Sequence, residues 1–435
     1  MSNEKKGKIQ WTPRLVLTIV GLSLAGSVIY ELPYLKYAYY DSLLAAFDLT
    51  NAQSGMLLSV YATSCMLLYI PGGLVADRWS AKKCMLFSLF GTGILGLILC
   101  FSMNRATAYI VWFLFGLSTS FVMWVALMKA IRLTGTKDTQ GTIYGLYYAL
   151  SGVIAVLTSF LFWGLYSKYI SVDAPSIEDH KKAMFAVIMA MSIVHFVAGI
   201  LVAITYKDHE DLDADEEKFR FRDVPKALSN PNIWIASALM FCMYAVYSCS
   251  SYFTPYFTSA LGVDASESAL LSILRTYVFF FFCPVLGKFA DKVMKSTLRT
   301  YVIGFVLLGL LYTGVLLVPA SPESRNVCIA ISFCAGLFSV MMYGIMWSIL
   351  TEIRIPTLYA ATAVGICSIF VYMPDLFLHT VFGNWLDVHG NDGYFRIFLT
   401  LGLLCVVAIV LCFTLRHRVL SGKGIEESSP AESDI

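Results

Sequence analysis

The sequence predicts an all-α membrane protein with twelve transmembrane helices in two six-helix bundles related by a pseudo-twofold axis. Of its 435 residues, 58% are hydrophobic and 14% are charged, whereas charged residues make up roughly a quarter of an ordinary soluble domain. Apolar stretches of about 20 residues recur along the whole chain, and each can cross a hydrocarbon layer of about 30 Å as a helix. A short basic motif occurs once in each half of the chain, which predicts two related bundles.

Breaks at charged residues and at Pro, Gly or Asn clusters divide the chain into twelve predicted spans. Their approximate limits are 14–39, 53–76, 83–103, 107–131, 140–166, 183–206, 232–258, 267–290, 299–319, 326–350, 358–386 and 394–415. In the first span, Pro33 and the tyrosine-rich stretch 34–40 are expected to kink or end the helix. Because a long apolar run follows the short basic segment 1–10, we interpret the first span as a membrane helix rather than a cleaved signal peptide.

The distribution of basic residues predicts the orientation. An even number of spans places both termini on one side of the membrane. Twenty-three of the 31 Lys and Arg residues fall on that side, seven fall on the other, and Arg275 falls within a span. Because basic loops remain in the cytoplasm, both termini are predicted to be cytoplasmic.

The longest polar connection, residues 207–230, divides the chain into its predicted domains. It joins an amino-terminal six-helix bundle, residues 1–206, to a carboxy-terminal one, residues 231–420, and residues 421–435 are expected to form a disordered cytoplasmic tail. The connection combines an acidic run with basic residues, which favours a solvated cytoplasmic linker. A regulatory or partner-binding loop is the alternative.

Several classes of function lack their sequence signals. The net charge of +2 gives no indication of nucleic-acid binding, and the eleven cysteines are scattered, without a CxxC pair or a zinc-ligand spacing. There is no phosphate-binding Gly-rich loop of the ATPase type, and no catalytic triad is visible. We therefore predict neither an enzyme nor a cofactor or metal site, and any driving force must come from an ion or solute gradient.

The repeated motif resembles that of a known family. It reads Gly73-Leu-Val-Ala-Asp77-Arg78 after the second span and Gly287-Lys-Phe-Ala-Asp291-Lys292 after the eighth. With twelve spans and a central polar linker, it resembles the major facilitator superfamily, although Ser80 and Met294 replace the glycine that completes the family motif. The resemblance implies a monomeric transporter that works by alternating access.

The motif residues have a predicted gating role. An acidic side chain at a helix end can pair with basic residues or with the amino terminus of a neighbouring helix. A pairing present in only one of two states shifts the conformational equilibrium, and glycines permit close helix approach. We therefore assign Gly73, Asp77, Arg78, Gly287, Asp291 and Lys292 to gating rather than to substrate binding.

Further segments resemble the YihN-type bacterial permeases, which are related to organic-anion carriers. The resemblance lies in residues 29–36, in residues 49–55 and in residues 244–247. It implies a bacterial inner-membrane location. The dipeptide Met-Trp is also repeated. It includes Trp124 near the end of the fourth span and Trp347 near the end of the tenth.

Arg275 is the strongest candidate for contact with a substrate. It lies about nine residues into the eighth span, roughly 13 Å from the nearer end of the helix, where a charged group costs about 2.5–3.5 kcal/mol. A guanidinium binds carboxylate, sulfonate or phosphate oxygens through paired hydrogen bonds. The alternative is a structural arginine paired with an internal carboxylate. An arginine in this helix also resembles the anion-binding position of oxalate- and monocarboxylate-type carriers.

Asp375 and His379 are candidates for proton coupling. Asp375 follows Pro374 in the eleventh span, where a proline-interrupted helix lines protein or a water-filled cavity. It can pair with Arg275 or take up a proton. His379, one turn further, can share that proton, but we favour a histidine at the membrane interface.

Glu31 and Lys36 complete the ionisable candidates. Lys36 provides either a second positive charge for an anion, as the resemblance to monocarboxylate-type carriers implies, or an interfacial cation. Glu31 is either a proton carrier or a partner of Lys36 or Arg275.

Tyrosines and tryptophans are further binding candidates. Tyr30 and Tyr34 in the first span, and Tyr244 and Tyr247 in the seventh, offer hydroxyls at helical spacing. For Tyr37 and Tyr40 we favour an aromatic belt at the membrane interface. Trp124 and Trp347 are weaker cavity candidates.

Three functions follow from these residues. The first is a secondary transporter of a small organic anion, held by Arg275 and Lys36, with proton symport or anion exchange through Asp375 or Glu31. The second is a carrier of a neutral or cationic solute that uses Asp375 and Glu31 as ligands. The third, outside transport, is a transporter-like sensor that signals through its linker or tail.

Overall fold

The computed structural model of the chain describes residues 11–134, 139–170, 174–208, 224–353, 355 and 360–421, with residues 69–78, 224, 226, 227, 360 and 361 described by their backbone alone. Regular structure throughout these residues is helical. The amino-terminal bundle contains α1 (Pro13–Val28), η1 (Leu35–Tyr37), α2 (Tyr40–Phe47), α3 (Asn51–Arg78), α4 (Ala81–Phe101), α5 (Arg105–Phe115), η2 (Gly116–Ser120), α6 (Met123–Thr134), α7 (Gln140–Ile170) and α8 (Ile177–Thr205).

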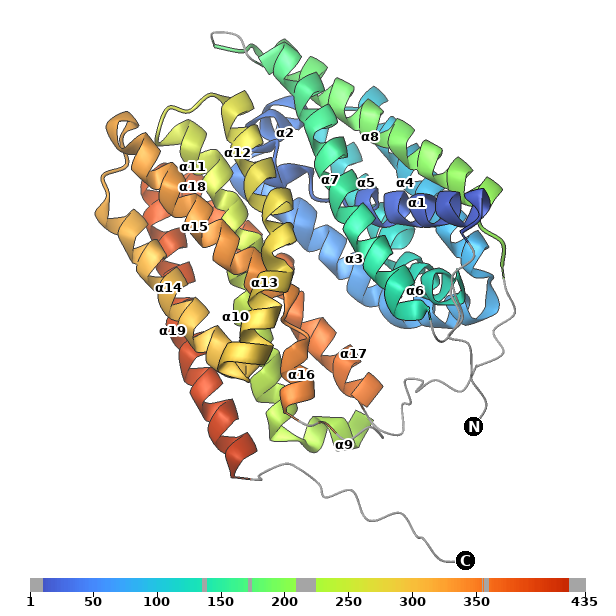
Figure 1. Cartoon of the computed structure of the whole chain (residues 1–435). Coiled ribbons are helices and arrows are strands. Elements are labelled where there is room, and N and C mark those ends of the chain that lie inside the picture. The colour runs from blue at the N-terminus through green and yellow to red at the C-terminus, as the bar shows by residue number, and fades with distance from the viewer. Residues whose placement is uncertain are drawn as a thin grey trace, which may run out of the picture.

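The carboxy-terminal bundle repeats this arrangement (Figure 1). It contains α10 (Pro231–Cys249), η4 (Ser250–Tyr252), α11 (Phe253–Ser259), α12 (Ala265–Tyr277), η5 (Val278–Phe282), α13 (Cys283–Phe289), η6 (Ala290–Met294), α14 (Thr297–Leu317), η7 (Pro322–Ser324), α15 (Arg325–Gly344), α16 (Ser348–Glu352), α17 (Ala360–Val371), α18 (Pro374–His389) and α19 (Asp392–Leu420). The short α9 (Val224–Ser229) precedes it.

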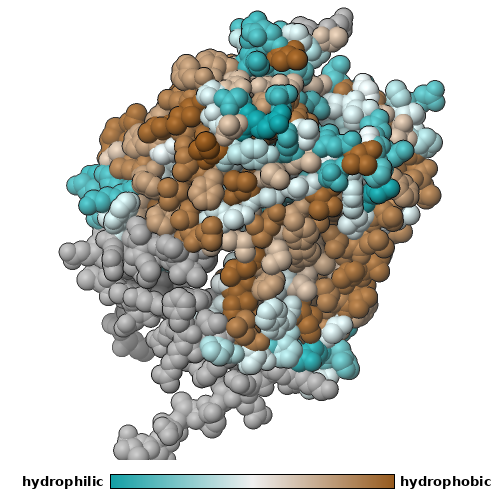
Figure 2. All heavy atoms as spheres, turned by 180° about the vertical axis from the view of Figure 1, so that it is seen from behind, coloured by the Kyte–Doolittle hydropathy of each residue, from teal (hydrophilic) through white to brown (hydrophobic). Residues whose placement is uncertain are grey.

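Hydropathy and length identify the spans. Ten helical segments of the described chain are long and apolar enough to cross a membrane, and the shorter apolar α1 is an eleventh candidate. The remaining predicted span coincides with α3, part of which is described by backbone only. Figure 2 shows apolar side chains over much of the middle of the visible face, with polar residues mainly above and below them.

Many spans are interrupted near their middle. As predicted, the first helix stops at Val28, and the chain turns through Pro33 before η1 and α2. The seventh span changes to η4 and the eighth to η5, although both were predicted as continuous helices. Irregular backbone at membrane depth is tolerated where it is buried in protein or lines a cavity, so these breaks indicate where the central site lies.

The repeated Met-Trp pair also lies at interruptions. Met123 is the first residue of α6, directly after the π-helical turn η2. Met346 and Trp347 form the break between α15 and α16. The internal repeat therefore marks corresponding breaks of the fourth and tenth spans.

The two bundles contact each other mainly at one end. We call the end that carries Arg78, Thr205 and Leu420 the basic end, and the opposite end the far end. Contacts between the bundles join α3 to α18, α7 to α12 and η5, and α2 to α11. The tightest approaches, of Gly55 to His379 and of Gly383 to Asn51, lie towards the far end. Figure 1 shows α8 and α19 diverging from this region towards the basic end.

Along one face of α7, the contact between the two bundles is lost towards the basic end. A β-carbon on Gly152 would lie 3.4 Å from Phe281 of the other bundle. Positions 148, 145 and 141 continue the same helical face towards the basic end. Tyr148 is 55% exposed, and a β-carbon on Gly145 or Gly141 would meet nothing within 4 Å. The bundles thus separate towards the basic end in this conformation.

Trp112 holds the unwound segment of the first span. Its side chain is buried, and Nε1 donates a hydrogen bond to the Pro33 carbonyl over 3.0 Å. Replacing Trp112 with Phe keeps an aromatic ring but removes this donor. We expect a lower melting temperature, corresponding to about 0.6–2 kcal/mol. Trp234→Phe is the control, because the Trp234 indole donates to Leu228 on an exposed surface. Equal melting temperatures for the two variants would contradict this role.

Candidate functional site

Arg275 is a buried cation that pairs with no carboxylate among the described residues. It lies in the last turn of α12, and only 2% of its surface is exposed. Its Nη2 donates to Thr254 Oγ1 over 3.4 Å, and its guanidinium lies 5.6 Å from the centre of the Phe253 ring. Within the described part of the chain, Nε and Nη1 have no hydrogen-bond partner. No ion pair joins Arg275 to a carboxylate of the described residues, so the predicted pairing with Asp375 is absent in this conformation.

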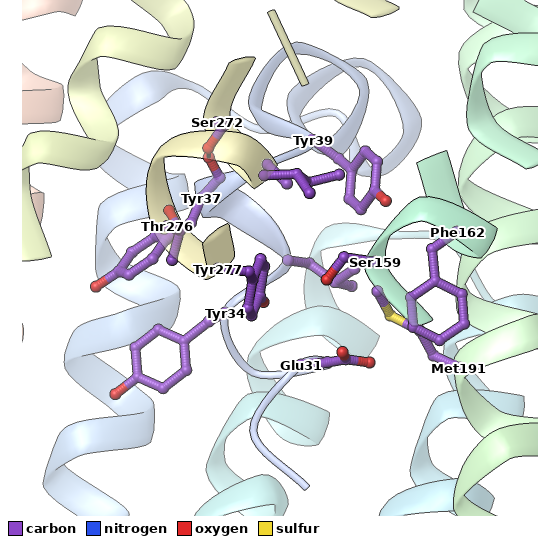
Figure 3. A pocket seen from close by; sticks show the side chains of 13 residues that line it. Glu31, Tyr34, Tyr37, Tyr39, Ser159, Phe162, Met191, Ser272, Thr276 and Tyr277 are labelled. Carbon is purple, nitrogen blue, oxygen red and sulfur yellow. Dashed lines mark hydrogen bonds between the residues drawn. The ribbon is translucent and has the colours of Figure 1, made fainter. Parts of the chain in front are cut away.

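Two small cavities lie among these helices, and Arg275 lines the smaller of them. One, of about 10 Å³, is lined by Arg275, Tyr37, Tyr247, Ser248, Ser250, Ser251, Thr276 and Val340. The other, of about 40 Å³, lies between the first, fifth, sixth and eighth spans and contains Glu31 (Figure 3). Tyr37 and Thr276 line both cavities. Because one water needs about 10–15 Å³, the smaller cavity has room for about one water and the larger for about three, and both must enlarge around an organic ligand.

Glu31 is a buried carboxylate with little compensation. It lies in the unwound part of the first span and is 6% exposed. Thr158 Oγ1 lies 3.1 Å from Oε1, but the same hydroxyl lies 2.9 Å from the Ile154 carbonyl. No residue that the structure describes forms a hydrogen bond with Oε2. Neither predicted partner, Lys36 or Arg275, forms an ion pair with Glu31 in the described structure.

Asp375 is the centre of a polar network. It begins α18, just after the break that ends α17, and is 2% exposed. Its Oδ2 accepts hydrogen bonds from Tyr34 over 3.1 Å and from Tyr244 over 2.7 Å. His379 Nε2 lies 3.4 Å from Oδ1. The expectation of an interfacial His379 is wrong, since the side chain is fully buried one helical turn from Asp375.

Lys36 is also buried, in η1. It is 2% exposed, its Nζ donates to Tyr252 Oη over 3.2 Å, and it lies 4.9 Å and 5.4 Å from the ring centres of Tyr252 and Tyr40. The Tyr252 hydroxyl in turn donates to the His379 carbonyl over 2.7 Å. The interfacial alternative for Lys36 is therefore wrong, although the residue lines neither of the two cavities.

Some of the predicted aromatic residues line a cavity and others do not. Tyr37 lines both cavities and Tyr40 is 3% exposed, so the predicted interfacial belt is wrong for both. Tyr247 lines the smaller cavity and stacks on Tyr343 with ring centres 4.2 Å apart. Tyr30 is half-buried in the unwound segment. Trp124 and Trp347 are 47% and 36% exposed and line neither cavity.

The repeated motif lies at the basic end. Helix α3 runs through Gly73, Asp77 and Arg78, whose side chains are outside the described part of the chain. In the second copy, Gly287 lies in α13, while Asp291 and Lys292 lie in the π-helical turn η6 and are exposed. The gating role remains a prediction.

Several site residues were not predicted. They are the hydroxyl-bearing side chains of Thr158, Ser248, Ser250, Ser251, Tyr252, Thr254, Ser272, Thr276 and Tyr277. The run of serines at 248–251 within an apolar span was the available signal. Among the described residues, no cluster of three His, Cys, Asp or Glu side chains fits a metal ion.

Comparison with known proteins identifies the family. Residues 15–374 match the model of the Major Facilitator Superfamily. The chain belongs to this superfamily. It is 26% identical to the Escherichia coli inner membrane protein YqcE, over 95% of this chain and 97% of that protein. It is 24% identical to the E. coli inner membrane protein YihN, over 95% and 96% of the two chains.

Solved structures agree on the fold. A bacterial homolog of the human lysosomal transporter Spinster, in an inward-facing and occupied conformation, superposes with a TM-score of 0.70 at 15% identity, covering 96% of this chain and 98% of that chain. The nucleoside transporter NupG, as a single-residue variant, gives 0.68 at 14% identity, covering 92% and 99%. The predicted superfamily and two-bundle architecture are thus confirmed. This superfamily member is a membrane transporter for a small molecule, rather than an enzyme.

Proposed function

We propose that this transporter carries a small organic anion by alternating access and binds its anionic group at Arg275. One observation carries the proposal: Arg275 is 2% exposed, yet its Nε and Nη1 have no hydrogen-bond partner among the described residues. A buried ion without a partner is costly, and a bound ion of opposite sign offsets that cost. A guanidinium with two free nitrogens suits a carboxylate, sulfonate or phosphate group.

The surrounding charges and hydroxyls support an anion. Ser248 and Thr276 offer hydroxyl groups around the smaller cavity. Lys36 is a second buried cation, also without an ion pair to any carboxylate among the described residues. Each of these two side chains supplies a positive charge that no described carboxylate pairs with, which favours an anionic group beside it. The alternative of a cationic solute is weaker, because Asp375 already has two tyrosine donors and an adjacent histidine.

The Asp375–His379 pair is the proposed proton-coupling site. Both side chains are buried, and the carboxylate is one helical turn from the imidazole. Ionisable pairs at membrane depth are typical of proton relays. Proton symport fits this arrangement, and anion exchange is the other mode. We further propose a bacterial inner-membrane location with both termini in the cytoplasm, a gating role for the repeated motif and a monomeric carrier.

Replacing Asp375 with Asn tests the coupling. Asn retains an oxygen that accepts from Tyr34 and Tyr244 but cannot take up a proton. We expect accumulation driven by a pH gradient in proteoliposomes to fall at least about tenfold, a loss of about 1.4 kcal/mol of coupling. Exchange of substrate without a gradient should persist. Asp392→Asn, at an exposed position, is the control. Unchanged gradient-driven uptake in the Asp375 variant would exclude this residue as the coupling site.

A counterflow panel tests the proposed substrate class. Purified protein in liposomes preloaded with one unlabelled solute is given the same solute in labelled form, across carboxylates, sulfonates, sugar phosphates, neutral sugars and amines. We expect counterflow with at least one anion class and none with amines or neutral sugars. Counterflow restricted to neutral or cationic solutes would overturn the proposal.

A further inference from the structure

We propose that the transported anion also carries an amino group, and that Glu31 binds this group while Arg275 binds the anionic one. The inference rests on the proposed function and extends it to a substrate class with charges of both signs. It also assigns Glu31 a direct role in substrate selection.

The state of the Glu31 carboxylate is the first observation. Among the described residues, its Oε2 is buried without a hydrogen-bond partner. Its Oε1 can accept a hydrogen bond from the Thr158 hydroxyl, but that hydroxyl also lies within hydrogen-bond distance of the Ile154 carbonyl. In Figure 3 this carboxylate lies at the edge of the larger cavity, below Ser159. A positively charged ligand group that donates hydrogen bonds would compensate the charge of Glu31 and bond to its oxygens.

The position of Arg275 is the second observation. Arg275 lines the smaller cavity and Glu31 the larger, and the two cavities share Tyr37 and Thr276 as walls. Tyr37 Oη is itself buried without a hydrogen-bond partner in the described residues. Two uncompensated charges of opposite sign therefore face adjoining spaces. A ligand that spans both needs an anionic group at one end and a cationic group at the other.

An ammonium group fits Glu31 better than a hydroxyl group does. A hydroxyl supplies one hydrogen bond but leaves the negative charge of the carboxylate uncompensated, whereas charge-assisted hydrogen bonds are roughly twice as strong as neutral ones. The aromatic side chains around Glu31 suit the short methylene chain that joins the two charged groups. Tyr34, Tyr39, Phe162 and Tyr277 line this part of the larger cavity.

Glu31 is separate from the proposed proton site. Asp375 bonds to Tyr34 and Tyr244 and adjoins His379, and none of these contacts involves Glu31. In the part of the chain that the structure describes, the cations Lys36 and Arg275 form no ion pair with Glu31 either. The rival role for Glu31 is proton transport. That role predicts a loss of gradient-driven uptake without a change in substrate selectivity.

Matched ligand pairs test the inference. Competition against the labelled anion in counterflow is measured for propionate and 3-aminopropionate, for ethanesulfonate and 2-aminoethanesulfonate, and for ethyl phosphate and 2-aminoethyl phosphate. The hydroxyl analogue of each pair is included. We expect the amino member of at least one pair to compete at least about tenfold better than its plain and hydroxyl analogues in the wild-type protein. This comparison needs no variant, so a failure to fold cannot mask it.

Glu31→Gln, which preserves shape and removes charge, then assigns the preference to this residue. We expect the variant to lose the preference for the amino member while plain anions still compete. Glu323→Gln, at an exposed position, should retain it. Equal competition by all three analogues, or a preference that persists in Glu31→Gln, would overturn the inference and leave the proposed function intact. The absence of competition by every anion would overturn both.

Discussion

Arg275→Gln is expected to reduce counterflow of the substrate anion at least about 30-fold, which corresponds to about 2 kcal/mol of lost binding. Glutamine is shorter and neutral, so the anionic group of the ligand would enter a buried site without a counter-charge. Arg275→Lys should recover part of the loss, because lysine restores the charge but not the planar pair of donors. The protein should still fold, since in this conformation Arg275 has only the long contact to Thr254 as a hydrogen bond.

Arg396→Gln is the matched control, because Arg396 is exposed on α19. It should retain wild-type counterflow. Thermal melting of all variants separates a binding defect from unfolding. Wild-type counterflow in Arg275→Gln would contradict the assignment of the anion site.

Gly55→Val is expected to prevent the far end from closing and so to stop the transport cycle. A β-carbon on Gly55 would overlap the backbone carbonyl of His379, and one on Gly383 would overlap the carbonyl of Asn51. Backbone contacts of this kind are not relieved by side-chain rotation. Overpacking costs about 1–3 kcal/mol, a factor of about 5 to 150 in the equilibrium between open and closed states.

The same interface contains specific bonds that the substitution would break. Asp387 at the end of α18 accepts from Asn51 N over 2.9 Å, from Asn51 Nδ2 over 2.8 Å and from Ala52 N over 2.8 Å. A carboxylate at a helix amino terminus is a favourable charge–dipole arrangement. Ser59 and Thr380 add a hydroxyl pair 2.9 Å apart. These bonds cross between the bundles, so separating α3 from α18 removes all of them.

Spin-label distances measure this effect directly. Labels at the exposed positions Thr50 and Val388 report on the far end, after the exposed Cys334 is replaced by Ser. We expect a longer distance in Gly55→Val than in the wild-type protein, together with at least a fivefold fall in counterflow. Gly145→Val is the control, because a β-carbon at Gly145 would meet nothing within 4 Å. An unchanged distance in Gly55→Val would show that this contact does not hold the closed state.

Hydropathy predicted the fold because a membrane span has a nearly fixed length. The helix interruptions were predicted less completely. Pro33 marked the break in the first span, whereas η4 and η5 were missed although Pro255 and Pro284 lie just beyond them. Proline disfavours helical backbone in the residue before it, so the signal was present in the sequence. The extent of each break depends on packing against neighbouring helices, which the sequence does not specify.

For the candidate site, the sequence predicted the charged residues but not the contacts they make. Arg275, Asp375, Glu31 and Lys36 were chosen as charges at membrane depth, and all four are buried. Their pairings were not predicted, because residues from different helices become neighbours only in the folded bundle. Thus Asp375 adjoins His379 and two tyrosines rather than Arg275. Tyrosines near a span end were assigned to the membrane interface, but the turn after Pro33 directs Tyr37 and Tyr40 inward.

The most direct test of the anion site is an experimental structure of the transporter with the anion identified by counterflow. We predict that the anionic group lies within hydrogen-bond distance of Arg275 Nε and Nη1, between Tyr247, Ser248 and Thr276. An anion bound elsewhere, with Arg275 still in contact only with Thr254 and Phe253, would contradict the account.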